Sequence, residues 1–184
     1  MKRKAIALIG VPAVGKTTIM RQFLKRINAK PQKVGHIPLL RSTTAVVLGV
    51  YDEGETFAGT DRMSMSIQPK VEEFLSKEWK GHVVFEGDRL GNLSFFRYVS
   101  KLPDTDLFVF VVTAKPETVT ARHHQRKDCQ TQTFLQSRAT KVNNLKGGLA
   151  GMAMFSSNVT LIVRKHETAE DTASIVKDML KLVE

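Results

Sequence analysis

Apolar runs of strand length alternate with amphipathic stretches along the whole chain. A run that is apolar at nearly every position predicts a strand buried on both faces of a parallel sheet. Five runs fit this pattern, and the fourth is the most uniformly apolar: residues 3–9, 45–51, 83–85, 107–112 and 159–163. We therefore expect a mainly parallel sheet of about five strands.

The stretches between these runs repeat apolar residues at helical spacing. They predict helices over 16–28, 69–81, 116–145 and 169–183, with a small-residue stretch at 147–153 after the third. Strands that alternate with helices predict an α/β fold with helices on both faces of the sheet and right-handed crossovers.

Three local signals complete the expected layout. Residues 52–55 predict a turn, from which residues 56–60 return as a hairpin strand. Thr168 and Asp171 have the spacing of a capping box before the last helix. Because neither an internal repeat nor a linker divides the sequence, we expect one domain over residues 1–184.

The composition is that of an ordinary globular protein, with 42% apolar and 25% charged residues. No stretch approaches the roughly 20 apolar residues of a membrane-spanning helix. Residues 1–11 have the order of a signal peptide, but Gly-Lys-Thr-Thr follows instead of a cleavage site, so we expect a cytoplasmic protein. The single cysteine, Cys129, fits a reducing compartment, and with His123, His124 and His166 it lacks zinc-site spacing.

Positive charge is concentrated in two segments. The net charge is +10, yet residues 1–51 contain ten basic residues and no acid. Residues 118–151 form a second basic segment, with Asp128 as their only acid. Such segments favour phosphates as partners, either of a nucleotide or of a nucleic-acid backbone; a solvated basic surface is the alternative.

The segment after the first predicted strand has the pattern of a phosphate-binding loop. Two glycines stand five positions apart, and Lys16 and Thr17 follow the second. In that setting backbone N–H groups cradle phosphate oxygens, the lysine reaches the β- and γ-phosphates, and the threonine hydroxyl binds Mg²⁺. The candidate nucleotide-binding residues are Gly10, Val11, Pro12, Ala13, Val14, Gly15, Lys16, Thr17 and Thr18.

Candidate catalytic acids follow another predicted strand. Glu86, Asp88 and Arg89 come directly after the apolar 83–85 run, where an α/β protein places carboxylates beside its phosphate loop. We favour Asp88 over Glu86 as the base, Asp88 with Thr17 as Mg²⁺ ligands, and Arg89 as a phosphate contact. A polar turn with a solvated aspartate is the alternative.

A second acidic segment is a candidate acceptor site. Asp61 and Arg62 are expected to form a hydrogen-bonded pair, with Met63 and Met65 as an apolar wall. Asp61 is also a candidate catalytic residue. An exposed ion pair beside core methionines would give the same pattern.

Basic residues in the 116–145 helical region are candidates for a lid. Arg122 and Arg126 stand four apart on one helical face, so both guanidinium groups could close on a triphosphate. Arg138 and Lys141 would continue that surface, which places the lid at about residues 116–150. A solvated basic helix is the alternative.

With these motifs the chain resembles P-loop kinases of the nucleoside and nucleotide kinase type. The resemblance implies a three-layer P-loop NTPase fold with a helical lid, ATP and Mg²⁺ as cofactors, and catalytic roles for Lys16, Asp88, Arg122 and Arg126. More narrowly, residues 59–65 and the basic character resemble bacteriophage kinases that phosphorylate 5-hydroxymethyluracil in DNA. That resemblance implies transfer of the γ-phosphate to a base hydroxyl of DNA, in the host cytoplasm.

Other functions remain open at this point. The alternative acceptor is a nucleoside or nucleoside monophosphate. A GTPase is disfavoured, because residues 88–91 supply only an acid-x-x-glycine element and residues 143–146 do not form a guanine-binding motif. A DNA-binding ATPase without an acceptor is a further alternative, and the oligomeric state is undetermined by the sequence.

Overall fold

The computed structural model describes the chain except residues 1, 56, 78, 128 and 129. Its sheet has the order β2-β3-β4-β5-β1-β6-β7. The strands are β1 (Arg3–Ile9), β2 (Lys30–Val34), β3 (Ile37–Arg41), β4 (Ala45–Leu48), β5 (His82–Glu86), β6 (Thr105–Thr113) and β7 (Val159–Lys165). The helices are α1 (Lys16–Arg26), α2 (Gln68–Lys77), α3 (Leu93–Ser100), α4 (Pro116–Arg126), α5 (Gln132–Phe155) and α6 (Ala169–Val183), with a 3-10 helix η1 at Thr60–Arg62.

The five expected strands form the parallel part of the sheet. β4, β5, β1, β6 and β7 pair in parallel, and β1 lies at the centre between β5 and β6. This confirms the predicted α/β fold. β2 and β3 add an antiparallel hairpin that we did not predict. The segment Lys-Pro-Gln-Lys-Val of β2 is almost entirely exposed at the sheet edge, so it carries no apolar alternation to reveal it.

Several element boundaries differ from the prediction. The hairpin strand expected at 56–60 is wrong, since its described residues contribute only the bridge between Val50 and Gly59 before η1 begins; Thr56 lies outside the described residues. α3 was not predicted, and α5 continues through 147–153 to Phe155. Glycine and alanine in that stretch hid the helix, because they give little apolar periodicity. The predicted capping box before α6 is confirmed.

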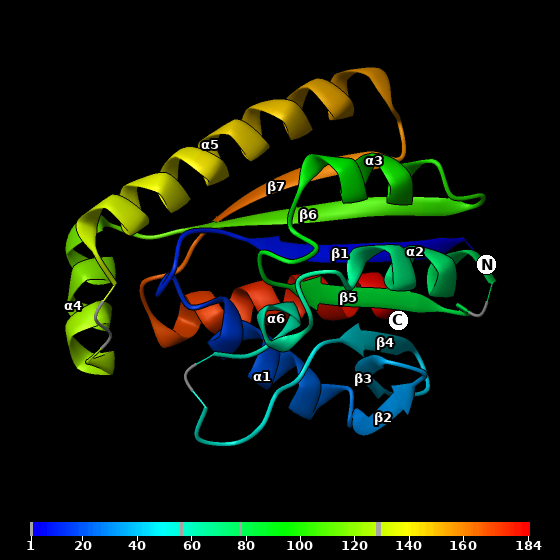
Figure 1. Cartoon of the computed structure of the whole chain (residues 1–184), viewed down its shortest axis with the longest axis horizontal. Coiled ribbons are helices and arrows are strands. Elements are labelled where there is room, and N and C mark those ends of the chain that lie inside the picture. The colour runs from blue at the N-terminus through cyan, green and yellow to red at the C-terminus, as the bar shows by residue number, and fades with distance from the viewer. Residues whose placement is uncertain (1, 56, 78, 128–129) are drawn as a thin grey trace.

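The helices cover the sheet on two sides and make three layers (Figure 1). α2, α3 and α5 pack on one face, and α1 and α6 on the other, so each face has its own apolar cluster. Both faces of the central strand are buried: residues 5–8 are fully inaccessible to solvent. The parallel strands therefore end together at one edge, on the left in Figure 1, where α4 and the start of α5 also lie.

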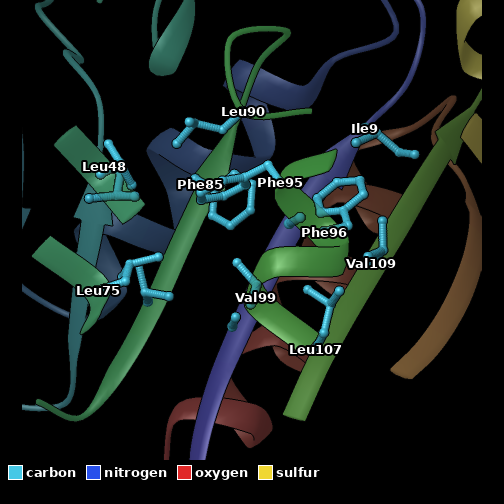
Figure 2. Packing of buried hydrophobic residues seen from close by; sticks show 14 of the residues in the cluster. Ile9, Leu48, Leu75, Phe85, Leu90, Phe95, Phe96, Val99, Leu107 and Val109 are labelled. Carbon is cyan, nitrogen blue, oxygen red and sulfur yellow. The ribbon is translucent and has the colours of Figure 1, made fainter. Parts of the chain in front are cut away.

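Aromatic residues fill the core beneath α3 (Figure 2). Phe85 of β5 meets Phe95 edge to face, with ring centroids 5.4 Å apart, and Phe96 at 6.2 Å. Such contacts add to the burial of apolar area. They fix the carboxyl end of β5, which carries the acidic residues of the site.

No helix among the described residues has the length and apolar character needed to cross a membrane. Cys129, from which we expected a reducing compartment, lies outside the described residues, and so does Asp128, the acid of the second basic segment.

We predict that F96A lowers the free energy of unfolding by about 3–5 kcal/mol, because it leaves a cavity under the fully buried Phe96. Urea denaturation followed by circular dichroism measures the change. F155A is the matched control: Phe155 is 88% exposed, so its removal should alter stability by less than about 0.5 kcal/mol. Equal losses in the two variants would contradict the described core.

Candidate active site

The loop between β1 and α1 adopts the backbone shape of an anion cradle. Gly10, Ala13 and Gly15 have positive φ values of 155°, 59° and 105°. A Cβ on Gly10 would lie 2.5 Å from the carbonyl oxygen of Val112, and one on Gly15 would lie 2.2 Å from Cε1 of His166. Only glycine fits both places, so the two glycines of the motif are required by conformation and by space.

Lys16 begins α1 and folds back over this loop. Its ammonium donates to the carbonyl oxygens of Gly10, at 2.9 Å, and Val11, at 3.1 Å. The positive charge therefore lies above the cradle and beside the positive end of the α1 dipole. A polyphosphate at this place meets backbone N–H groups, a helix N-terminus and an ammonium together.

Thr17 and Glu86 join the phosphate loop to the end of β5. The Thr17 hydroxyl donates to Glu86 Oε1 at 2.8 Å, and only 2% of Glu86 is exposed. Burial raises the pKa of Glu86 to about 7, against the opposing effects of Lys16 and the Thr17 hydrogen bond. Sequence reasoning favoured Asp88 as the carboxylate beside Thr17; the structure places Glu86 there.

Asp61 lies beside the same strand end. Its Oδ1 accepts from the backbone N–H of Asp88 at 2.6 Å, and neighbouring Thr60 donates to the carbonyl oxygen of Glu86 at 2.9 Å. These bonds hold η1 against the turn after β5. Burial raises the pKa of the Asp61 carboxyl, partly offset by the Asp88 hydrogen bond and by nearby Lys16.

Asp88 faces α5. Its carboxylate pairs with Arg138 at 2.5 Å and with Lys141 at 3.5 Å, and Lys141 also donates to its backbone oxygen. The two basic residues expected to extend a lid are thus joined to the acidic turn. All three side chains are about one-third exposed, so the pairing is open to solvent and to a competing anion.

The two predicted lid arginines lie differently. Arg122 donates to the carbonyl oxygens of Val14, His166 and Glu167, at 2.9, 3.2 and 3.4 Å, on the outer side of the phosphate loop. Arg126, one turn further along α4, borders the cleft described below. Both arginines line the second groove described below, but only Arg126 also reaches the cleft.

Arg62 does not form the expected pair with Asp61. It pairs with Asp52 at 2.7 Å, and it is not one of the residues that line the cleft. The expected methionine wall is also incomplete, because Met63 is buried whereas Met65 is 79% exposed. The η1 turn points consecutive side chains in different directions, which the sequence alone did not reveal.

A cleft of about 270 Å³ lies at the edge where these groups meet. The sequence analysis did not identify Phe57, Gln130 and Phe134 among its lining residues. Phe57 and Phe134 are part-exposed, and the Arg138 guanidinium lies 4.6 Å from the Phe134 ring centre. No motif marks them. Among the described residues, buried Arg89 Nε and Gln130 Oε1 have no hydrogen-bond partner. The lining residues are Gly10, Pro12, Ala13, Gly15, Lys16, Thr17, Phe57, Ala58, Asp61, Glu86, Asp88, Arg89, Arg126, Gln130, Phe134, Arg138 and Val142.

A second groove of about 510 Å³ opens on the other side of the phosphate loop. Thr18 and Gln22 of α1 face the His166–Ala169 segment across it, and Arg126 borders this groove as well as the cleft. A nucleotide whose phosphates occupy the loop therefore has room on both sides.

No group of three or more His, Cys, Asp or Glu side chains in the described part of the chain could hold a metal ion.

A glycine-shaped cradle after the central strand, with its lysine and a threonine bonded to a buried acid, defines a P-loop protein that binds a nucleotide. The chain belongs to a P-loop kinase family: the family model described as P-loop Nucleotide Kinase3 matches residues 1–181. The protein is thus a P-loop kinase, which confirms the broader resemblance; the narrower one, to phage DNA kinases, stays a prediction.

Solved structures share this fold at low sequence identity. A sugar kinase from Janibacter sp. HTCC2649 aligns with a TM-score of 0.54 and 10% identity, over 99% of this chain and 94% of that one. A gluconokinase from Sinorhizobium meliloti 1021 aligns with a TM-score of 0.51 and 11% identity, over 98% of both chains. A PezAT toxin-antitoxin structure from Streptococcus pneumoniae aligns with a TM-score of 0.52 and 14% identity, over 98% of this chain and 84% of that one. No curated protein matches the sequence.

We predict that E86Q changes how stability depends on pH. The folded protein holds the Glu86 proton with a pKa of about 7, against 4.5 ordinarily. Protonation at Glu86 therefore favours folding below pH 4.5, and that contribution is lost as the pH rises towards 7. E86Q lacks this loss, so its stability relative to wild type should rise by about 2–3 kcal/mol between pH 5 and pH 8. Urea titrations of both proteins at the two pH values, without ligands, measure it; a constant difference would contradict the burial of an ionisable Glu86.

Proposed function

We propose that this protein is an ATP-dependent kinase that transfers the γ-phosphate to a hydroxyl of a small nucleoside or nucleotide. The observation that carries the proposal is the cleft in which the phosphate loop, Lys16 and three acids face an aromatic and basic wall. A phosphate donor fits the loop side. An acceptor with a planar base and an anionic group fits the opposite wall.

Thr17 and Glu86 are suited to hold Mg²⁺ with the triphosphate. A hydroxyl and a carboxylate are hard oxygen donors, and the Thr17–Glu86 hydrogen bond shows that they already converge. The Glu86 proton, favoured by burial, must leave when a cation binds. Bound Mg²⁺ would neutralise charge on the phosphates.

Lys16 and Arg126 would hold the donor phosphates. The Lys16 ammonium exchanges its bonds to loop carbonyls for bonds to phosphate oxygens. Arg126 borders both the cleft and the second groove, so it lies where a triphosphate would connect them. We assign the nucleobase to that groove, where Thr18 and Gln22 offer polar groups. Arg122, bonded to the loop backbone, supports the loop from outside.

Asp61 is the base that the geometry favours. It borders the cleft, and the raised pKa of its carboxyl brings it closer to neutral pH, where a general base is most effective. Sequence reasoning preferred Asp88, but both oxygens of that carboxylate are engaged by Arg138 and Lys141. Asp88 remains the competing assignment, and Arg89 remains the proposed phosphate contact.

The region proposed as the lid, residues 116–150, comprises α4 and most of α5. Arg138 and Lys141 lie against a partly exposed Asp88, so an anionic acceptor can compete for them. We propose that Arg138 and Lys141 exchange Asp88 for the acceptor, and that this change of partner closes the cleft around the reacting groups. Residues 1–184 would then act as one kinase domain.

DNA is a second candidate acceptor, favoured by one observation. The acid-free segment 1–51 places Arg21, Lys25 and Lys30 around a groove of about 580 Å³, which Tyr51 and the acidic Glu53 also line. Cations beside an apolar wall fit the phosphates and bases of a single strand. 5-Hydroxymethyluracil presented by such a strand would offer the required hydroxyl.

Labelled ATP decides between these acceptors. The protein is incubated with γ-labelled ATP, Mg²⁺ and nucleosides, nucleoside monophosphates, hydroxymethyluracil DNA or unmodified DNA. Label in a small acceptor supports the proposal, label only in modified DNA supports the second candidate, and free phosphate alone contradicts both.

K16A should lower transfer by about 100-fold or more with an unchanged thermal midpoint, because it removes one preorganised phosphate contact from the surface. Unimpaired transfer by K16A would contradict the assigned site.

The pair D61N and D88N tests the base. Asparagine at either position keeps an oxygen but cannot take a proton, so loss of the base should lower kcat by roughly 100-fold or more. We expect this in D61N with little change in the KM for ATP, whereas D88N should chiefly raise the KM for the acceptor. Steady-state kinetics with the best acceptor measure both. The reverse pattern would assign the base to Asp88.

A further inference from the structure

We propose that His166 is a positioning residue of the phosphate loop, which it keeps in its nucleotide-binding shape by hydrogen bonding to the Val14 carbonyl. This role rests on the proposed binding of ATP by the loop. His166 entered the sequence argument only as a residue without zinc spacing, and it lies at the end of β7, remote in sequence from the loop it contacts.

Two donors from different elements meet the same carbonyl oxygen. His166 Nδ1 lies 2.8 Å from Val14 O, and the Arg122 guanidinium of α4 donates to it at 2.9 Å. Arg122 is itself held by the backbone oxygens of His166 and Glu167. The loop is therefore fastened from outside by the end of β7 and by α4.

The direction of this carbonyl determines what the loop offers a ligand. In a trans peptide the C=O of one residue and the N–H of the next point to opposite sides. Holding Val14 O towards His166 turns the Gly15 N–H the other way, towards the cradle. A carbonyl turned inward would instead place negative charge against a phosphate. Gly15, with a φ of 105°, is a position at which the peptide plane rotates easily once its restraint is lost.

The imidazole ring of His166 is held in place by its surroundings. It is 4% exposed and lies flush against Gly15, where a Cβ would be 2.2 Å from its Cε1. Because a carbonyl only accepts, Nδ1 carries the proton. Nε2 lies 2.8 Å from the hydroxyl oxygen of Thr172 in the first turn of α6, and that hydroxyl has one proton to share between Nε2 and the Thr168 carbonyl oxygen, 3.2 Å away. Burial lowers the pKa of His166 and nearby Arg122 lowers it further, against the raising effects of the Val14 bond and Asp171, so the neutral form fits.

Two amide substitutions separate the nitrogens of the ring. H166N places an amide near Nδ1 and can still donate to Val14, whereas H166Q places it near Nε2 and serves Thr172 only. H166F keeps a flat ring without any donor. Isothermal titration with Mg·ATP, and with Mg²⁺ and inorganic triphosphate as a probe of the loop alone, measures binding without an acceptor.

We expect H166Q and H166F to bind both probes about tenfold more weakly than wild type, as loss of one buried hydrogen bond implies, and H166N to stay within about threefold. Thermal unfolding of each variant is the control, because a purely structural role would lower the midpoint without distinguishing H166N from H166Q. If H166Q does not fold, the comparison of H166F with H166N serves the same purpose. Wild-type affinity in H166Q and H166F, or equal weakening in H166N, overturns the proposal. A wild-type protein that fails to bind Mg·ATP instead contradicts the proposed function itself.

Discussion

The backbone shape of the turn between β1 and α1 sets where every other group of the site can act. Its glycines have positive φ values and no space for a Cβ, so the turn presents N–H groups where side chains would otherwise stand. β1 is central and buried over residues 5–9, which fixes the turn at the edge where the parallel strands end (Figure 1). From outside, Arg122 and His166 contact the Val14 carbonyl of this turn.

Three carboxylates lie at this edge, and each has a different environment. Glu86 is buried against Thr17, Asp61 accepts a backbone N–H, and Asp88 meets two cations of α5. Environments that differ in burial and partners give chemically similar acids separate roles. Glu86 and Asp88, at and just after the end of β5, and Asp61 in η1 therefore differ in the partners available to them.

The structural neighbours establish the fold of this chain, and the family model establishes its class. Similarity at 10–14% identity to a sugar kinase, a gluconokinase and a toxin-antitoxin structure establishes only the fold. The matched family is one of nucleotide kinases. The aromatic side chains Phe57 and Phe134 beside arginines are the basis on which we propose an acceptor with a nucleobase.

The parallel core and the phosphate loop were predictable because each is encoded by contiguous residues. Buried strands reveal themselves as apolar runs, and the Gly–Lys–Thr spacing prescribes a local backbone shape. The exposed β2–β3 hairpin was not predictable, since a polar edge strand has no apolar pattern. The glycine- and alanine-containing end of α5 was concealed for a similar reason.

The apolar runs and the glycine spacing were enough to predict a phosphate loop after the first strand of an α/β sheet. They did not predict that Glu86 contacts Thr17 while Asp88 contacts α5, because those contacts join distant parts of the folded chain. Two residues apart on a strand, these acids would point to the same side, but the φ of 111° at Gly87 turns the chain between them. His166 likewise contacts Val14 only in the folded chain, because the two residues are 152 positions apart in the sequence. Local spacing prescribes backbone shape, whereas side-chain partnership depends on how distant elements pack.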